Sequence, residues 1–214
     1  MMQTFKAFSA LLSYPQADML AALPEIADIV RTSPLIGQRE RQGLLELVED
    51  LATGDVLEAE ERYVDLFDRG RALSLNLFEH LHGDSRDRGT AMVDLKQLYE
   101  ASGFELATRE LPDFLPVVLE YLSRRNMDEA RELLTDCAHI LKSIARAMIA
   151  RQSQYAAVLQ SLLVIAGEQP VDGDKIRPVK EPVELLDRNW AEQPAFAGAS
   201  MPGNPGFNAT NSEN

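Results

Sequence analysis

Two histidines beside a carboxylate are the most direct candidates for metal chemistry in this sequence. They are His80 and His82, and Asp84 follows two residues later. A zinc site needs three or four converging ligands, whereas an i, i+2 pair at the end of a helix directs its two rings apart. The sequence contains no second histidine pair and no CxxC motif that would complete a site. We therefore expect no bound metal, and a metal-binding regulator is kept only as an alternative function.

A second candidate for chemistry is His139, in the run Ala138-His-Ile-Leu-Lys-Ser-Ile-Ala145. This run resembles the phosphoacceptor helix of histidine phosphotransfer domains, in which a Leu-Lys pair follows the reactive histidine. Lys142 would neutralise the phosphoryl group, but Ser143 stands where that family usually has glycine. Helices generate such patterns often, so we expect a partly buried structural histidine here. A histidine phosphotransfer module that uses His139 remains the alternative function.

No other residues form a recognisable catalytic set. Cys137 has no neighbouring base in the sequence, and we expect it to pack as a small hydrophobic residue. The sequence lacks a G-x-S-x-G motif and lacks a glycine-rich loop that opens a helix to hold phosphate. We therefore expect no catalytic residues, no cofactor and no enzymatic activity.

The protein is strongly acidic, with a net charge of −13 and a pI of about 4.7. Nucleic-acid affinity comes largely from Lys and Arg side chains that displace counterions, so phosphate backbones repel this surface. Anionic membranes repel it for the same reason. A basic partner is attracted, over some distance at low salt. The charge therefore argues against nucleic-acid binding and against direct membrane binding, and it favours a basic protein partner.

Neither secretion nor membrane insertion is indicated by the sequence. Ser9 and Ser13 interrupt the apolar residues of the N-terminus, Pro15 ends them, and no cleavage site follows. No apolar run approaches the roughly 20 residues that span a bilayer. The single cysteine excludes an intramolecular disulfide and suits a reducing compartment. We therefore expect a cytoplasmic protein.

Helical periodicity runs through most of the chain, and capping residues mark the expected boundaries. The first helix carries a stripe of apolar residues from Phe5 to Leu12. Pro24 predicts a break in the next apolar stretch. Proline and capping residues predict that helices start at Ser33-Pro34, at Asp55 with Glu58, at Pro112-Asp113 and at Asn126 with Glu129. Two further helices are expected over residues 72–81 and 90–102. The region from Asn126 to Leu163 is expected to be a long helical stretch that Gly167 ends.

These patterns predict an all-α protein with a single helical-bundle domain over residues 1–167. Alternating β-branched runs are absent, so no strand is expected. Residues 168–214 are rich in proline and glycine and predict a low-complexity, disordered tail. Trp190 and Phe196 are apolar points in that tail. Truncation after about Glu168 is therefore expected to leave the thermal stability almost unchanged.

Two segments combine aromatic and charged residues in a way that fits a partner-binding groove. One runs from Tyr63 to Gly89, and the other runs Glu110-Leu-Pro-Asp-Phe-Leu-Pro-Val-Val-Leu-Glu-Tyr-Leu122. Helices joined by polar loops would give the same pattern without any function, since exposed ion pairs stabilise a fold by less than about 1 kcal/mol each. A groove with an apolar floor and a charged rim, which receives a helix from another protein, is the functional interpretation.

Both segments resemble the delta subunit of respiratory nitrate reductase, one of the helical chaperones that mature redox enzymes. The resemblance is detailed across YVDLFDRGRALSLNLFEHLHGDSRDRGTAMVDL and ELPDFLPVVLEYL, and it is collinear from the N-terminus to about residue 165. It implies a chaperone that binds the N-terminal segment of the apo alpha subunit, alone or in the soluble alpha–beta complex. It further implies that the alpha subunit is held ready for insertion of the molybdenum cofactor and released before membrane assembly. Phe114, after the Pro-Asp pair, favours the nitrate reductase branch of these chaperones.

The resemblance also implies which residues bind the partner. The residues that match the first motif are Tyr63, Phe67, Asp68, Arg69, Phe78, Glu79, His80, His82, Asp84 and Arg86, and those that match the second are Glu110, Pro112, Asp113, Phe114, Glu120 and Tyr121. Leu66 and Leu119 lie within apolar stripes and are expected in the core. Asp68, Glu79 and Asp113 are expected at the rim of the groove, because a carboxylate is rarely buried without a partner.

Overall fold

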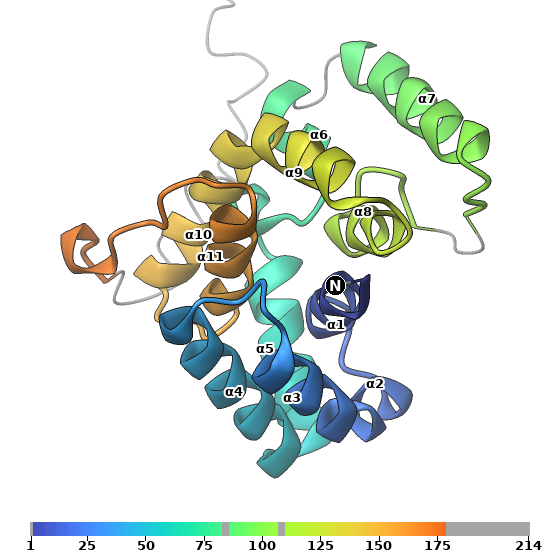
Figure 1. The fold of residues 1–214 in the computed structure, drawn as a ribbon. Coiled ribbons are helices and arrows are strands. Elements are labelled where there is room, and N and C mark those ends of the chain that lie inside the picture. The colour runs from blue at the N-terminus through green and yellow to red at the C-terminus, as the bar shows by residue number, and fades with distance from the viewer. Residues whose placement is uncertain (1, 83–85, 107–109, 179–214) are drawn as a thin grey trace, which may run out of the picture. The chain divides into compact units, whose positions relative to one another are not determined.

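The computed structural model describes residues 2–82, 86–106 and 110–178, apart from the side chains of His82 and Arg86. Asp84, Trp190 and Phe196 lie outside the described residues. Within those ranges the chain forms only helices, namely α1 (Met2–Leu11), α2 (Ala17–Ala21), α3 (Leu23–Thr32), α4 (Gln38–Thr53), α5 (Val56–Phe67), η1 (Arg71–Leu73), α6 (Leu77–His82), α7 (Arg86–Ala101), α8 (Leu115–Leu122), α9 (Met127–Asp136), α10 (Ala138–Ala150), α11 (Ala156–Ile165) and η2 (Gly173–Lys175) (Figure 1). The all-α prediction is confirmed.

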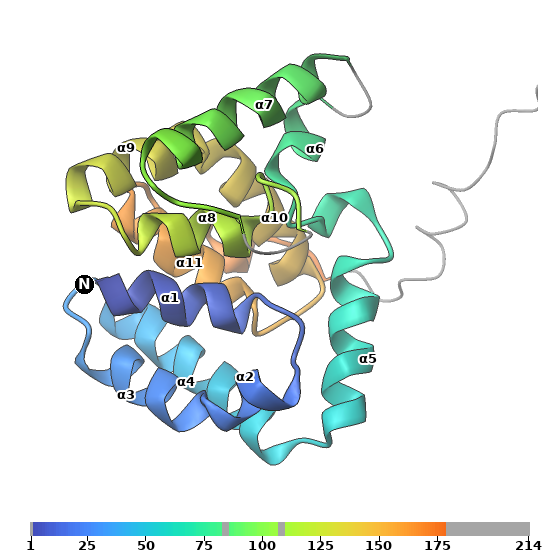
Figure 2. The same ribbon diagram turned by 90° about the vertical axis from the view of Figure 1, so that its right-hand side faces the viewer.

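The N-terminal helix α1 lies at the centre of the fold. It packs against α8 on one side and against α3 on the other, as Figure 2 shows. Its apolar stripe is fully covered, since Phe8 and Leu11 have no exposed surface and Phe5 has 1%. A helix this short is marginal alone in water, so the burial of this stripe stabilises it. The core continues through α10 and α11, which pack on each other, and α11 also packs on α4.

Several helix boundaries differ from those expected. Ser33 does not start a helix but ends α3, and α4 begins only at Gln38. The Ser33 hydroxyl instead bonds the Thr4 hydroxyl at 2.8 Å and accepts the N–H of Leu35, so the Ser-Pro pair forms a turn. The expected helix over 72–81 is two short pieces, η1 and α6, and α7 begins at Arg86, ahead of the expected Thr90.

The C-terminal part of the domain is divided more finely than the periodicity indicated. Asn126 caps α9 as expected, with its side-chain oxygen accepting the N–H groups of Asp128 and Glu129. The helical stretch after it breaks at Cys137 and again between α10 and α11, giving three helices instead of one. Gly167 has a φ of 81°, which a residue with a Cβ rarely adopts, and it ends α11.

Packing continues beyond Gly167, where the sequence indicated the start of the tail. Val171 is 8% exposed, and its N–H and C=O both bond the side chain of Gln160 at 2.8 and 2.7 Å. The Nζ of Lys142 lies 2.6 Å from Oε2 of Glu168. Residues 168–178 are thus attached to α10 and α11. None of the helices in the described ranges is both long and apolar enough to cross a membrane.

Candidate functional site: an acidic cavity beside the N-terminal helix

A short backbone pairing brings the two singled-out segments together. Asn76 and Phe114 form an isolated antiparallel bridge, the N–H of Leu115 donates to the C=O of Leu75 at 2.8 Å, and the N–H of Leu77 donates to the C=O of Asp113 at 3.0 Å. The residues just before α6 therefore lie beside those just before α8. This pairing fixes one wall of the cavity described below.

Asp113 belongs to this pairing and not to the rim, so that expectation is wrong. It has no exposed surface, and its Oδ2 accepts the N–H of Phe78 at 2.9 Å, in the first turn of α6. The rule that carboxylates avoid burial fails here because the N–H of Phe78 at the start of α6, 35 residues earlier, supplies a partner for one of the two carboxylate oxygens. Burial raises the pKa of Asp113 above its ordinary value, while the Phe78 N–H and the nearby charge of Arg88 act in the opposite direction.

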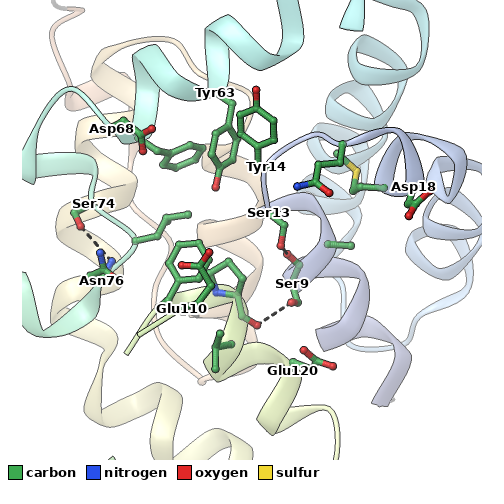
Figure 3. A pocket seen from close by; sticks show the side chains of 18 residues that line it. Ser9, Ser13, Tyr14, Asp18, Tyr63, Asp68, Ser74, Asn76, Glu110 and Glu120 are labelled. Carbon is green, nitrogen blue, oxygen red and sulfur yellow. Dashed lines mark hydrogen bonds between the residues drawn. The ribbon is translucent and has the colours of Figure 1, made fainter. Parts of the chain in front are cut away.

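The cavity has a volume of about 650 Å³ and draws residues from both segments and from the N-terminus. Figure 3 shows it from close by. We call it the acidic cavity. Its apolar lining is Ala10, Met19, Phe67, Leu75, Phe114, Pro116 and Val117, and its uncharged polar lining is Ser9, Ser13, Tyr14, Gln16, Tyr63, Ser74 and Asn76.

Four carboxylates complete the lining, and two of them belong to the segment Glu110–Leu122. Asp18 is on α2, Asp68 follows the end of α5, Glu110 precedes α8, and Glu120 is on α8 (Figure 3). The described residues that line the cavity include no Lys, Arg or His. Such a site attracts a cation and repels an anion at short range. Its apolar lining can at the same time cover the nonpolar face of a peptide.

Tyr63 connects the cavity wall to α1. Its hydroxyl donates to the C=O of Leu12 at 2.8 Å, and its ring packs edge-on against Tyr14, with centroids 5.5 Å apart. Phe67 and Tyr155 complete an aromatic cluster behind the wall. Burial raises the pKa of Tyr63, so its hydroxyl stays protonated and can keep donating to Leu12.

Ser9 on α1 holds the opposite wall in place. Its hydroxyl donates to the C=O of Pro116 in α8 at 2.8 Å. A carbonyl oxygen has two lone pairs, so the Pro116 C=O can accept this bond in addition to a helical one. The hydroxyl of Ser13, just after α1, donates to the C=O of Ser9 at 2.8 Å. Ser9 therefore positions α1 against α8 at the edge of the cavity, and Ser13 bonds the last turn of α1.

The structure assembles only part of the predicted partner-binding set. Six of those residues line the acidic cavity, namely Tyr63, Phe67, Asp68, Glu110, Phe114 and Glu120. The others have different surroundings. Arg69 pairs with Asp65 on the exposed side of α5, Glu79 pairs with Arg88 at 3.5 Å, and Nε2 of His80 lies 2.9 Å from the C=O of Ser74. The N–H of Phe78 donates to the carboxylate of Asp113, and Asp113 itself is buried.

The remaining predicted residues lie elsewhere. Tyr121 packs into a separate aromatic cluster with Tyr99 and Phe104, and Pro112 accepts a hydrogen bond from the Tyr99 hydroxyl through its C=O. Asp84 lies outside the described residues, as do the side chains of His82 and Arg86. Within the described ranges, no three His, Cys, Asp or Glu side chains gather in a way that could hold a metal ion.

The contribution of the N-terminus was missed by reasoning from the sequence. Ser9, Ser13, Tyr14 and Asp18 all line the acidic cavity. The available signal was the pair of serines at i, i+4, which puts two hydroxyls on one face of an otherwise apolar helix. That spacing indicates a polar contact for this face, although it does not say which of the distant segments provides it.

His139 is placed differently from the expectation of a partly buried residue. It lies on the exposed side of α10, and the nearby Lys142 is paired with Glu168. A Lys that is held by a carboxylate is not available to neutralise a phosphoryl group. Cys137 is half-buried, and burial, followed by the charge of Asp136, raises the pKa of its thiol to about 11.

Comparison with known proteins gives a consistent set of relatives. The family model described as "Nitrate reductase delta subunit" matches residues 35–160. The nitrate reductase molybdenum cofactor assembly chaperone NarJ of Escherichia coli is 41% identical over 191 residues, which are 86% of this chain and 80% of that protein. A probable chaperone of the same description from Bacillus subtilis is 34% identical over 75% of this chain and 86% of its own length. The crystal structure of a protein described as a redox enzyme maturation protein, from Archaeoglobus fulgidus, superimposes with a TM-score of 0.55 and 25% identity, covering 76% of this chain and 91% of that one.

Proposed function

The chain belongs to the nitrate reductase delta subunit family, and from this premise we propose that it is a system-specific chaperone for respiratory nitrate reductase. In this proposal it binds the N-terminal segment of the apo alpha subunit, alone or in the soluble alpha–beta complex. It keeps that subunit soluble and competent for insertion of the molybdenum cofactor, and it dissociates before membrane assembly. The relatives from Escherichia coli and Bacillus subtilis described above are named as assembly chaperones and not as enzymes, in agreement with the expectation of no enzymatic activity.

The observation that carries the proposal is the sign of the charge in the acidic cavity. Four carboxylates surround an apolar lining, with no basic side chain among the described residues there. A peptide that carries Lys or Arg beside apolar side chains complements both features. Long-range attraction to a protein of net charge −13 raises the association rate of such a peptide, and the apolar lining then removes water from its nonpolar face.

The same features suit a complex that must come apart. Asp18 and Asp68 are exposed, and ion pairs at exposed sites contribute only about 0.2–1 kcal/mol each. Affinity built from several such contacts is moderate and salt-dependent, which permits release. A site intended for permanent assembly would instead be expected to present a larger and more apolar surface.

The proposal is tested by removing negative charge from the acidic cavity and comparing the result with a control variant of the same net charge. A triple variant, Asp18→Asn, Asp68→Asn and Glu120→Gln, neutralises three lining carboxylates. The control variant, Glu132→Gln, Asp136→Asn and Asp174→Asn, neutralises three exposed carboxylates away from the cavity, so both variants have the same net charge. Each is titrated calorimetrically at two salt concentrations with a synthetic peptide of the first about 15 residues of the alpha subunit, a length that gives a helix of about 22 Å.

We expect the cavity variant to bind the peptide roughly tenfold or more weakly and to lose most of the salt dependence, while the control variant behaves as the wild type does. Three lost ion pairs of about 0.5 kcal/mol each sum to about 1.5 kcal/mol, and about 1.4 kcal/mol corresponds to a tenfold change in affinity. If both variants bind equally, only the overall charge matters, and the acidic cavity is not where the peptide binds.

A further inference from the structure

We propose that the docking surface for the partner continues from the acidic cavity, across Glu110, into a second cavity beside α7. This inference rests on the proposed function, because it concerns the same partner segment. The second cavity, which we call the α7 cavity, has a volume of about 420 Å³. It is bounded by the C-terminal half of α7 and by the residues that precede α8.

Glu110 lines both cavities, so the two adjoin at this residue. On the side of the acidic cavity its charge is close enough to contribute to the raised pKa of Tyr63. On the other side the next lining residue is Pro112, whose C=O accepts the hydroxyl of Tyr99 at 2.9 Å. Tyr99 is completely buried, so this bond holds the residues around Glu110 firmly against α7. A bound segment that leaves the acidic cavity past Glu110 therefore meets a preformed surface.

The α7 cavity repeats the chemistry of the acidic cavity. Glu100, Glu105 and Glu110 contribute three carboxylates, and among the described residues that line this cavity the one cation is Lys96, whose Nζ lies 3.7 Å from Oε1 of Glu100. Tyr99 and Phe104, with ring centroids 5.3 Å apart, form an aromatic floor. Negative charge around an aromatic floor again suits a basic segment with one apolar face, so the same occupant fits both cavities.

Exposed apolar side chains on the two segments that bound the α7 cavity support the extension of the docking surface into it. Leu98 on α7 is 45% exposed, and Leu111, between Glu110 and Pro112, is 44% exposed. Each belongs to a segment that bounds the cavity. A helix laid across Glu110 would cover part of both side chains, which adds to the favourable free energy of binding in proportion to the apolar area removed from water.

The acidic cavity has a second possible exit, and charge distinguishes the two. Ala10 also lines a cavity of about 260 Å³ between α1 and α3, whose charged residues are Lys6 and Glu25. One cation and one anion give that cavity no net attraction for a basic segment. The partner is therefore expected to extend toward α7, and the cavity between α1 and α3 supplies a control.

The experiment compares two synthetic peptides of the alpha subunit, covering its first about 15 and its first about 30 residues; as helices these are about 22 and 45 Å long. Both are titrated calorimetrically into the full-length chain. The test variant is Glu100→Gln with Glu105→Gln, and the matched control is Glu25→Gln with Glu132→Gln, so both variants lose two negative charges. All four carboxylates lie on the surface in helices or loops, so the substitutions leave the fold intact.

We expect the long peptide to bind the wild type roughly tenfold more tightly than the short one. The test variant should lose most of that difference without weakening the short peptide, and the matched control should change neither affinity. Equal affinities of the two peptides for the wild type, or a difference that survives in the test variant, would overturn the extension while leaving the acidic cavity as the proposed site. Failure of both peptides to bind would instead overturn the proposed function itself.

Discussion

Asp113 is the residue whose environment departs most from its sequence-based expectation, and its buried carboxylate has a measurable consequence. Its raised pKa means that the folded protein binds the carboxyl proton of Asp113 more tightly than the unfolded chain does. The stability contributed by Asp113 therefore falls as the pH rises from the unfolded-state pKa, near 3.9, through the higher folded-state pKa. Asp113→Asn keeps an oxygen for the Phe78 N–H and removes the buried charge. At pH 7 we expect this variant to melt at or above the wild-type temperature, with the difference shrinking toward pH 4.

The alanine variant separates the hydrogen bond from the charge. Asp113→Ala removes the charge as Asp113→Asn does, and it also removes the acceptor of the Phe78 N–H at the start of α6. It should therefore be about 1–2 kcal/mol less stable than the asparagine variant at any pH. Thermal melts of both variants across the pH range measure the two effects. If the asparagine variant were less stable than the wild type at pH 7, attraction between the carboxylate and Arg88 would outweigh the cost of burial.

The thiol of Cys137 should be slow to react. With a pKa raised by burial to about 11, only about one thiol in 1,000 is ionised at pH 8, and the thiolate is the reactive form. Alkylation by iodoacetamide, followed by mass spectrometry, should be roughly a hundredfold slower for the native than for the urea-unfolded protein, and its rate should rise about tenfold per pH unit up to pH 10. A plateau near pH 9 would show that the thiol is solvated in the native state.

Among the elements, α8 is predicted to be one of the most sensitive to truncation of a core side chain. Leu119 is completely buried between α8 and its neighbours, whereas Leu57 on α5 is 69% exposed and has the same side chain. Leu119→Ala should lower the free energy of unfolding by about 2–5 kcal/mol, and Leu57→Ala by less than about 0.5 kcal/mol. Urea denaturation measures both. Similar losses in the two variants would mean that helix propensity, and not packing, dominates.

The sequence could predict elements better than it could predict their contacts. Leu66 and Leu119 are in the core as expected, with 9% and 0% exposure, because an apolar stripe is a local property of one helix. Asn126 caps α9 for the same local reason. The placement of Ser9 against Pro116 and of Asp113 against Phe78 joins residues 107 and 35 positions apart, and no local pattern specifies such a pair. Half of the acidic cavity depends on these distant contacts.

At Ser33-Pro34 the sequence predicted the start of a helix, whereas the structure has a turn there. Serine followed by proline is favoured at the start of a helix, but also in a turn, where proline fixes φ and the hydroxyl bonds a nearby N–H. Here the hydroxyl of Thr4, from α1, bonds Ser33 and stabilises the turn. The choice between the two structures is therefore made by a tertiary contact.

At the scale of the whole molecule, the position of truncation should matter. A chain that ends at Glu168 loses Val171 and its two bonds to Gln160, whereas one that ends at Pro178 keeps them. We expect the shorter chain to lose about 1–3 kcal/mol, or roughly 2–8 °C in Tm, and the longer one to melt as the full-length chain does. Differential scanning calorimetry distinguishes them. The division into a domain over 1–167 and a tail stays a prediction, and equal melting of all three chains would support that boundary.

The bond between Ser9 and Pro116 has a consequence for the order of events on the ribosome. α1 leaves the exit tunnel before α8, which packs on it and is made more than 100 residues later. Translation at about 5–20 residues per second separates the two by roughly 5–20 s. During that interval the apolar face of α1 has no native cover from α8, and the acidic cavity lacks one of its walls. If the acidic cavity binds the alpha subunit as we propose, a chain can do so only after its own synthesis has passed α8.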